Sequence, residues 1–75
     1  MRIINKKDNK ALIYYNNEFY VISESVVPFT GLETLIFKSD AQGTITDWIE
    51  VGGGKGLTLN EVIKDIDTYM TRRWG

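Results

Sequence analysis

Two apolar, β-favouring runs near the start of the chain predict an antiparallel hairpin. Residues 11–15 and 18–22 flank Asn16 and Asn17, and asparagine tolerates the left-handed backbone that a two-residue turn needs. The pairing that this turn imposes places apolar side chains on both faces of the hairpin. Because a single helix can cover only one face of a sheet, we expect another segment to cover part of the second face.

A second hairpin is predicted where residues 34–38 and 45–51 flank a turn at 40–43. Asp40 favours the start of a turn, and Gly43 can adopt the left-handed conformation of a type I turn followed by a bulge. This hairpin places Trp48 opposite Ile36, outside the face that a helix would cover. A Trp that is buried in an interface is a common anchor.

The segments around the first hairpin are expected to be a short edge strand at 2–4 and a loop at 25–32. Proline donates no N–H and pushes the preceding residue out of the helical region, so Pro28 favours a loop. Apolar side chains in a loop are costly to leave in water. They either fold back as a lid over the core or form a contact patch for a partner, and we assign this choice to Val26, Val27, Pro28 and Phe29.

The last third of the chain is predicted to be one amphipathic helix. Thr58 and Glu61 have the spacing of a capping box, and Arg72 and Arg73 lie at the negative end of the helix dipole. One apolar stripe recurs at helical spacing: Leu59, Val62, Ile63, Ile66, Tyr69, Met70 and Trp74. Strands followed by a helix predict a single α+β domain over 1–75, an antiparallel meander of four or five short strands packed by one C-terminal helix.

The amino-acid composition excludes several kinds of catalytic and metal site. The 75 residues include no cysteine and no histidine, which excludes disulfides, Cys/His zinc sites, a Cys nucleophile and a His general base. The carboxylates of Asp65 and Asp67, and those of Asp47 and Glu50, point in different directions on their predicted elements. We therefore expect no enzymatic activity, no cofactor and no metal. The core of so short a chain is thin, so a homodimer is expected.

Charge and hydropathy indicate a cytoplasmic protein. The N-terminus turns polar too early for a signal peptide, and no apolar run is long enough to cross a bilayer. The net charge of −1 predicts neither nucleic acid nor a membrane as partner. Basic residues gather in the first ten positions, while the remainder is acidic as far as Asp67. This is either an ordinary solvated surface or an acidic face that meets a basic partner.

The glycine-rich segment 52–56 joins the last predicted strand to the helix. A helix N-terminus can hold an anion, so Gly53, Gly54, Lys55 and Gly56 are a weak anion-binding candidate. The P-loop spacing is not met, because Gly56 stands where the hydroxyl residue would be. The favoured interpretation is a mobile connector.

Residues 33–37, Glu-Thr-Leu-Ile-Phe, and 43–48, Gly-Thr-Ile-Thr-Asp-Trp, resemble a hairpin pattern in a group of very small phage and prophage proteins. The resemblance covers roughly 11–73 in outline and 33–48 in detail, and the segment 52–56 departs from it. It implies a phage context, in which small proteins often bind a host protein, for example as inhibitors of a defence system such as CRISPR. No functional residue carries over.

We therefore expect a non-catalytic protein-binding module that acts on a host protein in the host cytoplasm. Its expected contacts are Val26, Val27, Pro28, Phe29 and Trp48. One alternative is a protein that sequesters a small ligand or nucleotide at 52–56. The other is a weak nucleic-acid binder, in which aromatic residues at 14–20 stack on bases beside the basic N-terminal segment.

Overall fold

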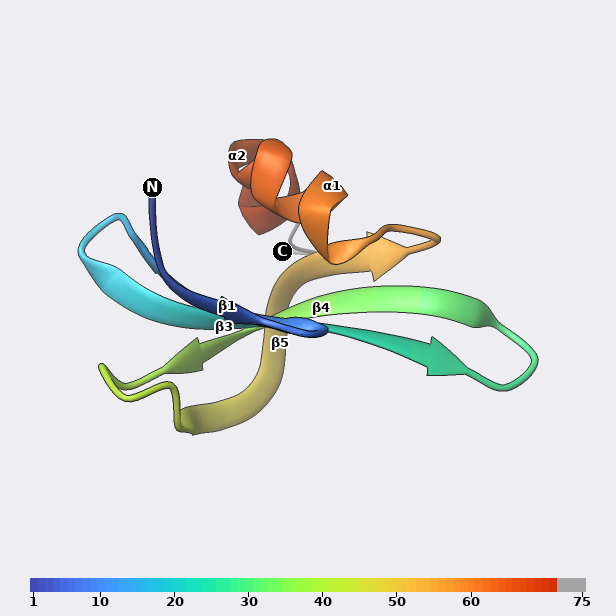
Figure 1. Cartoon of the computed structure of the whole chain (residues 1–75), viewed down its shortest axis with the longest axis horizontal. Coiled ribbons are helices and arrows are strands. Elements are labelled where there is room, and N and C mark those ends of the chain that lie inside the picture. The colour runs from blue at the N-terminus through green and yellow to red at the C-terminus, as the bar shows by residue number, and fades with distance from the viewer. Residues whose placement is uncertain (72–75) are drawn as a thin grey trace.

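The computed structural model describes residues 1–71, which form a five-stranded antiparallel sheet followed by two short helices. The strands lie side by side in chain order, and both helices lie over one face of the sheet (Figure 1). The elements are β1 (Arg2–Lys7), β2 (Lys10–Tyr15), β3 (Glu18–Val27), β4 (Gly31–Ser39), β5 (Ile45–Lys55), α1 (Leu59–Lys64) and α2 (Ile66–Thr71). The predicted α+β class and meander are confirmed. The expectations for Arg72, Arg73 and Trp74 lie outside the described residues.

The first hairpin has the predicted register. Ile13 pairs with Tyr20 and Leu12 pairs with Val21. The turn residues Asn16 and Asn17 have φ angles of 51° and 66°, as a two-residue turn between twisted strands requires. The sequence signal here is strong because two adjacent asparagines can adopt this conformation at little cost.

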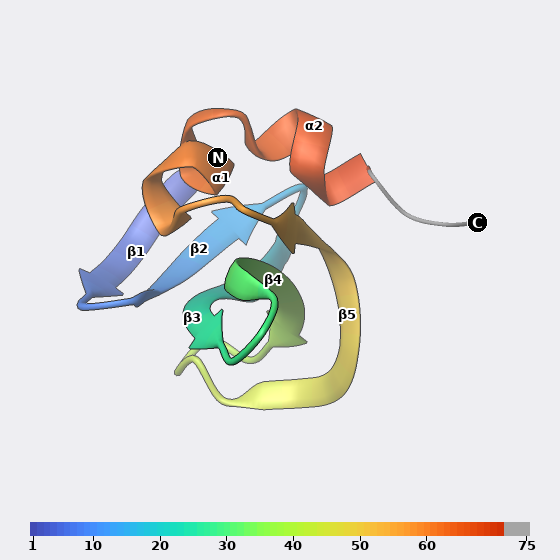
Figure 2. The same ribbon diagram turned by 90° about the vertical axis from the view of Figure 1, so that its right-hand side faces the viewer.

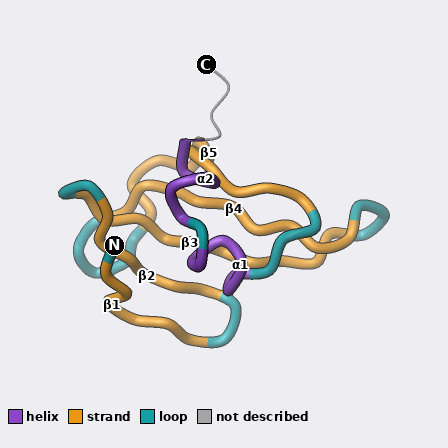
Figure 3. Tube along the Cα trace, turned by 90° about the horizontal axis from the view of Figure 1, so that it is seen from above, coloured by secondary structure: helices purple, strands orange, loops and turns teal. Residues whose placement is uncertain are grey.

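The predicted loop at 25–32 is wrong. β3 continues to Val27 and β4 begins at Gly31, so only a tight turn separates them. Pro28 does prevent a strand from passing through it, but it lies in the turn, where its missing N–H has no ladder bond to make. The paired strands form a long arm that projects beyond the helices (Figure 3).

The predicted single helix is also wrong, because the chain breaks it at Asp65, whose φ and ψ are −134° and 52°. The Asp65 carbonyl accepts hydrogen bonds from the N–H groups of Thr68 and Tyr69, so Asp65 starts α2 in the way that an N-cap residue does. The capping box that begins α1 is confirmed. Thr58 N–H donates to Glu61 Oε1, and Glu61 N–H donates to Thr58 Oγ1.

The core lies between the helices and the sheet. Ile13, Ile22, Ile36 and Val62 are fully buried there. The remaining members of the cluster are Ala11, Tyr20, Leu59, Ile66 and Met70. The apolar sides of α1 and α2 therefore both face the sheet, although the break divides the predicted stripe between two axes.

Part of the second face is covered, as expected, and the covering segment is the first half of β5. The pairing of β4 with β5 jumps from Ile36 and Gly52 to Lys38 and Asp47, so residues 48–51 form a bulge opposite Phe37. β5 therefore curls from beneath the sheet up to the helices (Figure 2). Val21 and Phe37 on this face are only 6% and 9% exposed.

The segment 52–56 is not a connector. Gly52 to Lys55 form the end of β5 and pair with β4. A Cβ atom on Gly52 would lie 2.4 Å from the carbonyl oxygen of Tyr69 in α2. Gly53, also buried, approaches the Thr34 backbone in the same way. Both glycines are therefore required by close approach to a neighbouring backbone, a use of glycine that sequence alone does not distinguish from a linker.

Candidate binding surface

The β3–β4 arm ends in a turn whose backbone conformation is unusual for its sequence. Val27 pairs with Gly31 across the turn. Phe29 has a φ of 76°, and Pro28 precedes it. A proline followed by a left-handed residue is the arrangement of a type II turn, in which glycine or asparagine normally occupies the left-handed position. A phenylalanine at this position has a strained backbone conformation.

The side chains of this turn point into solvent. Phe29 is fully exposed, Val26 is 79% exposed, Pro28 is exposed and Val27 is half-buried. The alternative that these residues fold back as a lid over the core is therefore wrong. We call residues 26–31 the hairpin tip.

The hairpin tip carries one feature that opposes folding and one that contributes nothing to it. A left-handed backbone costs a residue with a Cβ about 1–2 kcal/mol, and an exposed phenyl ring gives no burial free energy to the fold. The backbone cost is not offset by a contact of the ring within the described residues, because Phe29 is fully exposed. Local strain that the fold does not use often marks a site of interaction.

Trp48 lies on a second exposed surface. It is 73% exposed, Ile49 beside it is 70% exposed, and both belong to the β5 bulge. Trp48 lies outside the helix-covered face, as predicted, but Ile36 pairs with Gly52 and not with Trp48. The bulge and the hairpin tip lie near opposite ends of β4, so the five predicted contact residues do not form one site (Figure 1).

Trp48 also has a structural role, because its ring packs against Phe37 with centroids 5.4 Å apart. We expect Trp48→Ala to uncover Phe37 and to lower the free energy of unfolding by about 1–2 kcal/mol, given the usual strength of an aromatic pair and the apolar area exposed. Trp48→Phe should retain most of this stability. Urea titrations followed by circular dichroism measure both variants, and equal midpoints for Trp48→Ala and the parent chain would contradict the role.

The sequence pattern does not identify Ile49 and the apolar residues of β1 as exposed side chains. Ile3 and Ile4 are 45% and 40% exposed, and the register of β1 with β2 shifts between Ile3 and Asn5. A bulge at an edge strand discourages pairing with another sheet. No local sequence signal marks either bulge, because each depends on the pairing partner.

The anion-binding candidate lacks the geometry that motivated it. Gly53, Gly54 and Lys55 are strand residues, and Gly56 donates its N–H to the Leu32 carbonyl. At the start of α1, the Leu59 N–H donates to Glu24 Oε2 at 2.8 Å. A carboxylate of the protein therefore already occupies a position that an anion would need.

The aromatic residues at 14–20 divide between the two faces of the sheet, as predicted. Tyr14 contacts Phe19 on one face, and Tyr15 contacts Tyr20 on the other. They therefore do not form one stacking platform for bases. Tyr15 also donates a hydrogen bond of 2.5 Å from its hydroxyl to Asp67 Oδ1, which fixes α2 to β2.

Two ionisable groups near the helices have shifted pKa values. Hydrogen bonds from the Thr58 backbone and side chain hold the pKa of Glu61 below its ordinary value. This stabilisation of the capping box is present at neutral pH and is lost as the pH falls through the lowered pKa. The hydrogen bond to Asp67 raises the pKa of Tyr15, because ionisation would remove the donated proton.

The Tyr15 shift predicts an alkaline effect on stability. A folded-state pKa above the ordinary tyrosine value stabilises the fold fully below about pH 10, and the effect is lost as the pH rises through the raised pKa. We expect Tyr15→Phe to be less stable than the parent chain at pH 7, and the difference to shrink above pH 10. Urea midpoints of both chains at several pH values measure it. A difference that does not change with pH would contradict the assignment.

Three further observations concern metal ions, membranes and similarity to known proteins. Among residues 1–71, no group of three or more His, Cys, Asp or Glu side chains is placed to hold a metal ion. No helix in that part of the chain is long and apolar enough to cross a membrane. Comparison of the chain with protein-family models, with curated proteins and with solved structures finds no match.

Proposed function

We propose that the protein is a non-catalytic protein-binding module whose principal contact is the hairpin tip. One observation carries this proposal: Phe29 is fully exposed although its backbone is held in the left-handed region. The fold would gain from glycine or asparagine at this position, so the phenyl ring serves something outside the described fold.

The β3–β4 arm can present Phe29 as a rigid anchor. β3 and β4 are paired continuously from Phe19 and Ser39 to Val27 and Gly31, which holds the tip at the end of a long ribbon. An aromatic side chain presented on a rigid turn loses little conformational freedom when it binds. Buried aromatic anchors dominate the energetics of many interfaces. The partner that fits is a protein with an apolar pocket wide enough for a phenyl ring.

Within this proposal the partner is a protein of the bacterial host, as the resemblance to small phage proteins implies. An inhibitor of a host defence system is one example. The acidic residues from Glu24 to Asp67 would steer the protein toward a basic surface, which raises the association rate more than the affinity. A homodimer and a cytoplasmic location stay predictions, and sedimentation equilibrium tests the first of them.

Phe29→Asn tests the proposal through two opposite effects. Asparagine tolerates the left-handed region, so we expect the free energy of unfolding to rise by about 1 kcal/mol and the melting temperature by about 4–8 °C. We expect the same variant to lose its partner. Thermal denaturation measures the first effect, and affinity capture of tagged protein from bacterial lysate, read by mass spectrometry, measures the second.

The matched control is Ile4→Asn, which places the same residue at an exposed apolar position on β1. It should retain every protein that the parent chain captures. A Phe29→Asn variant that captures the same proteins as the parent chain would contradict the proposal. A less stable Phe29→Asn variant would contradict the strain argument on which the proposal depends.

A further inference from the structure

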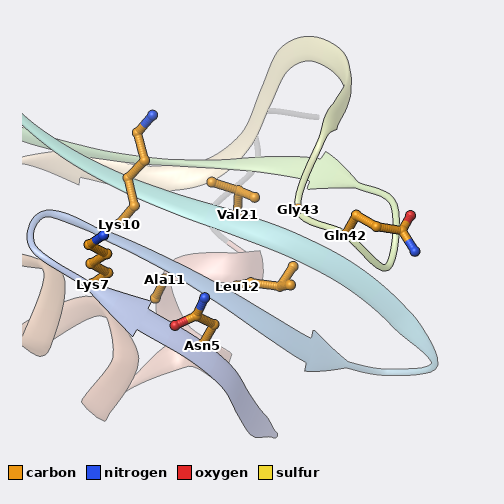
Figure 4. A pocket seen from close by; sticks show the side chains of 8 residues that line it. All are labelled: Asn5, Lys7, Lys10, Ala11, Leu12, Val21, Gln42 and Gly43. Carbon is orange, nitrogen blue, oxygen red and sulfur yellow. The ribbon is translucent and has the colours of Figure 1, made fainter.

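A pocket of about 160 Å³ lies on the face of the sheet away from the helices. Its floor comes from β2 and β3, one side comes from β1, and the β4–β5 turn forms the opposite side (Figure 4). The lining residues are Asn5, Lys7, Lys10, Ala11, Leu12, Val21, Gln42 and Gly43. The pocket shares no residue with the hairpin tip, so it is independent of the function proposed above.

One end of the pocket carries two lysines, and neither forms an ion pair with a carboxylate in the part of the chain that the structure describes. Lys7 and Lys10 are cross-strand partners in the register of β1 with β2, and both line the same end of the pocket (Figure 4). Like charges directly opposite each other destabilise a sheet. Among residues 1–71 the ion pair is that of Lys38 with Glu18; neither pocket lysine forms a direct ion pair there, and the nearest carboxylate in sequence is that of Asp8, in the turn between them.

The rest of the pocket combines apolar and amide groups. Leu12 and Val21 supply the apolar floor, and the side-chain amide of Asn5 can donate or accept a hydrogen bond, whereas the amide of Gln42 points outward from the turn (Figure 4). The β4–β5 turn is close enough to form a wall, because a Cβ on Gly43 would lie 3.7 Å from Leu12 Cδ2. An apolar floor beside a few convergent polar groups is the usual composition of a small-molecule site.

We propose that this pocket binds a small amphipathic anion, in which a phosphate or carboxylate is joined to one apolar group about the size of a ring. Lys7 and Lys10 contact the anionic group through charge-assisted hydrogen bonds, which are stronger than neutral ones. The apolar group lies on Leu12 and Val21. A cavity of about 150 Å³ is large enough for benzene, so the volume sets the size of the apolar part.

The test is a titration of isotope-labelled protein followed by nuclear magnetic resonance, with phenyl phosphate and benzoate as probes. We expect shifts centred on Lys10, Leu12, Val21 and Gly43, with a dissociation constant of about 1 mM, as for a fragment-sized ligand. Benzyl alcohol, which lacks the charge, should bind about tenfold more weakly. Inorganic phosphate, which lacks the ring, should also bind more weakly. The two anionic probes distinguish a phosphate from a carboxylate ligand.

Charge-removal variants separate this site from general attraction of anions. Lys7→Gln with Lys10→Gln should weaken phenyl phosphate binding by at least about tenfold and should not lower the melting temperature, because it removes a like-charge pair. Lys6→Gln with Lys64→Gln changes the net charge equally, and neither residue lines the pocket; it should bind as the parent chain does. The proposal is overturned by equal binding of the two double variants, by shifts centred elsewhere, or by no shift with either anionic probe.

Discussion

Gly53→Ala is expected to lower the free energy of unfolding by about 2–5 kcal/mol, a large share of the stability of the protein. Gly53 has a φ of 107°, and a Cβ on it would lie 2.1 Å from the Thr34 carbonyl oxygen in β4. Backbone strain costs about 1–2 kcal/mol, and forced separation of packed groups adds about 1–3 kcal/mol. A domain of 75 residues has a total stability of about 4–11 kcal/mol. Urea denaturation followed by circular dichroism measures the loss.

Two other glycines serve as matched controls that separate the causes. Gly56 has a φ of 76° but open space around its missing Cβ, whereas Gly52 has the close contact without a left-handed backbone. Gly56→Ala should cost about 1–2 kcal/mol, from strain alone. Gly52→Ala should cost about 1–3 kcal/mol, from contact with α2. If Gly53→Ala were no worse than Gly56→Ala, the close pairing of β4 with β5 would be refuted.

Ile36→Ala is expected to have the second largest effect. Ile36 is 0% exposed, and it lies in β4 under the helices, within the cluster that joins sheet and helices. Truncation of a buried isoleucine typically costs about 2–5 kcal/mol, because the cavity that remains is only partly filled by relaxation. This is a large share of the stability of so small a domain. Thermal denaturation at neutral pH measures it.

Ile49→Ala is the matched control, since it makes the same chemical change at a side chain that is 70% exposed. Its effect should stay within about 0.5 kcal/mol, as for most surface substitutions. Similar melting temperatures for the two variants would mean that the core does not lie between the helices and the sheet.

The elements that the sequence predicts correctly are those defined by local chemistry. Asn16 and Asn17 determine both the turn and the register of the first hairpin, and Thr58 with Glu61 determines the start of α1. In each case the decisive groups lie within a few residues of one another. Hydrophobic patterning also indicates correctly that both faces of the first hairpin need cover.

The errors occur where distant contacts decide the local structure. Gly52 and Gly53 have the composition of a linker, but they pair with β4 as strand residues, and the approach of Tyr69 and Thr34 leaves no space for a side chain on them. Asp65 interrupts an unbroken helical pattern, and α2 is fixed by the hydrogen bond from Tyr15 to Asp67, 52 positions apart. Propensity within a window of sequence contains neither contact.

The sequence predicts only part of the candidate binding surface, for a similar reason. The sequence identified 26–29 as an apolar segment in need of an explanation, but it left open whether the segment lies over the core. The choice depends on how far β3 and β4 stay paired, and they stay paired as far as Val27 and Gly31. The sequence does not predict the pocket at Lys7 and Lys10, because this pocket also requires Gln42 and Gly43 from a turn that the first hairpin does not specify.

The strand order of the sheet has a consequence for the speed of folding. Each strand pairs with the strand that precedes it in the chain, so every sheet contact between neighbours closes a short stretch of polypeptide. Short closures lose little chain entropy before their contacts form. A sheet built only from such neighbouring pairs is expected to form faster than the sheets of a β-sandwich of equal length, whereas the hydrogen bond from Tyr15 to Asp67, 52 positions apart, closes a much longer stretch of chain.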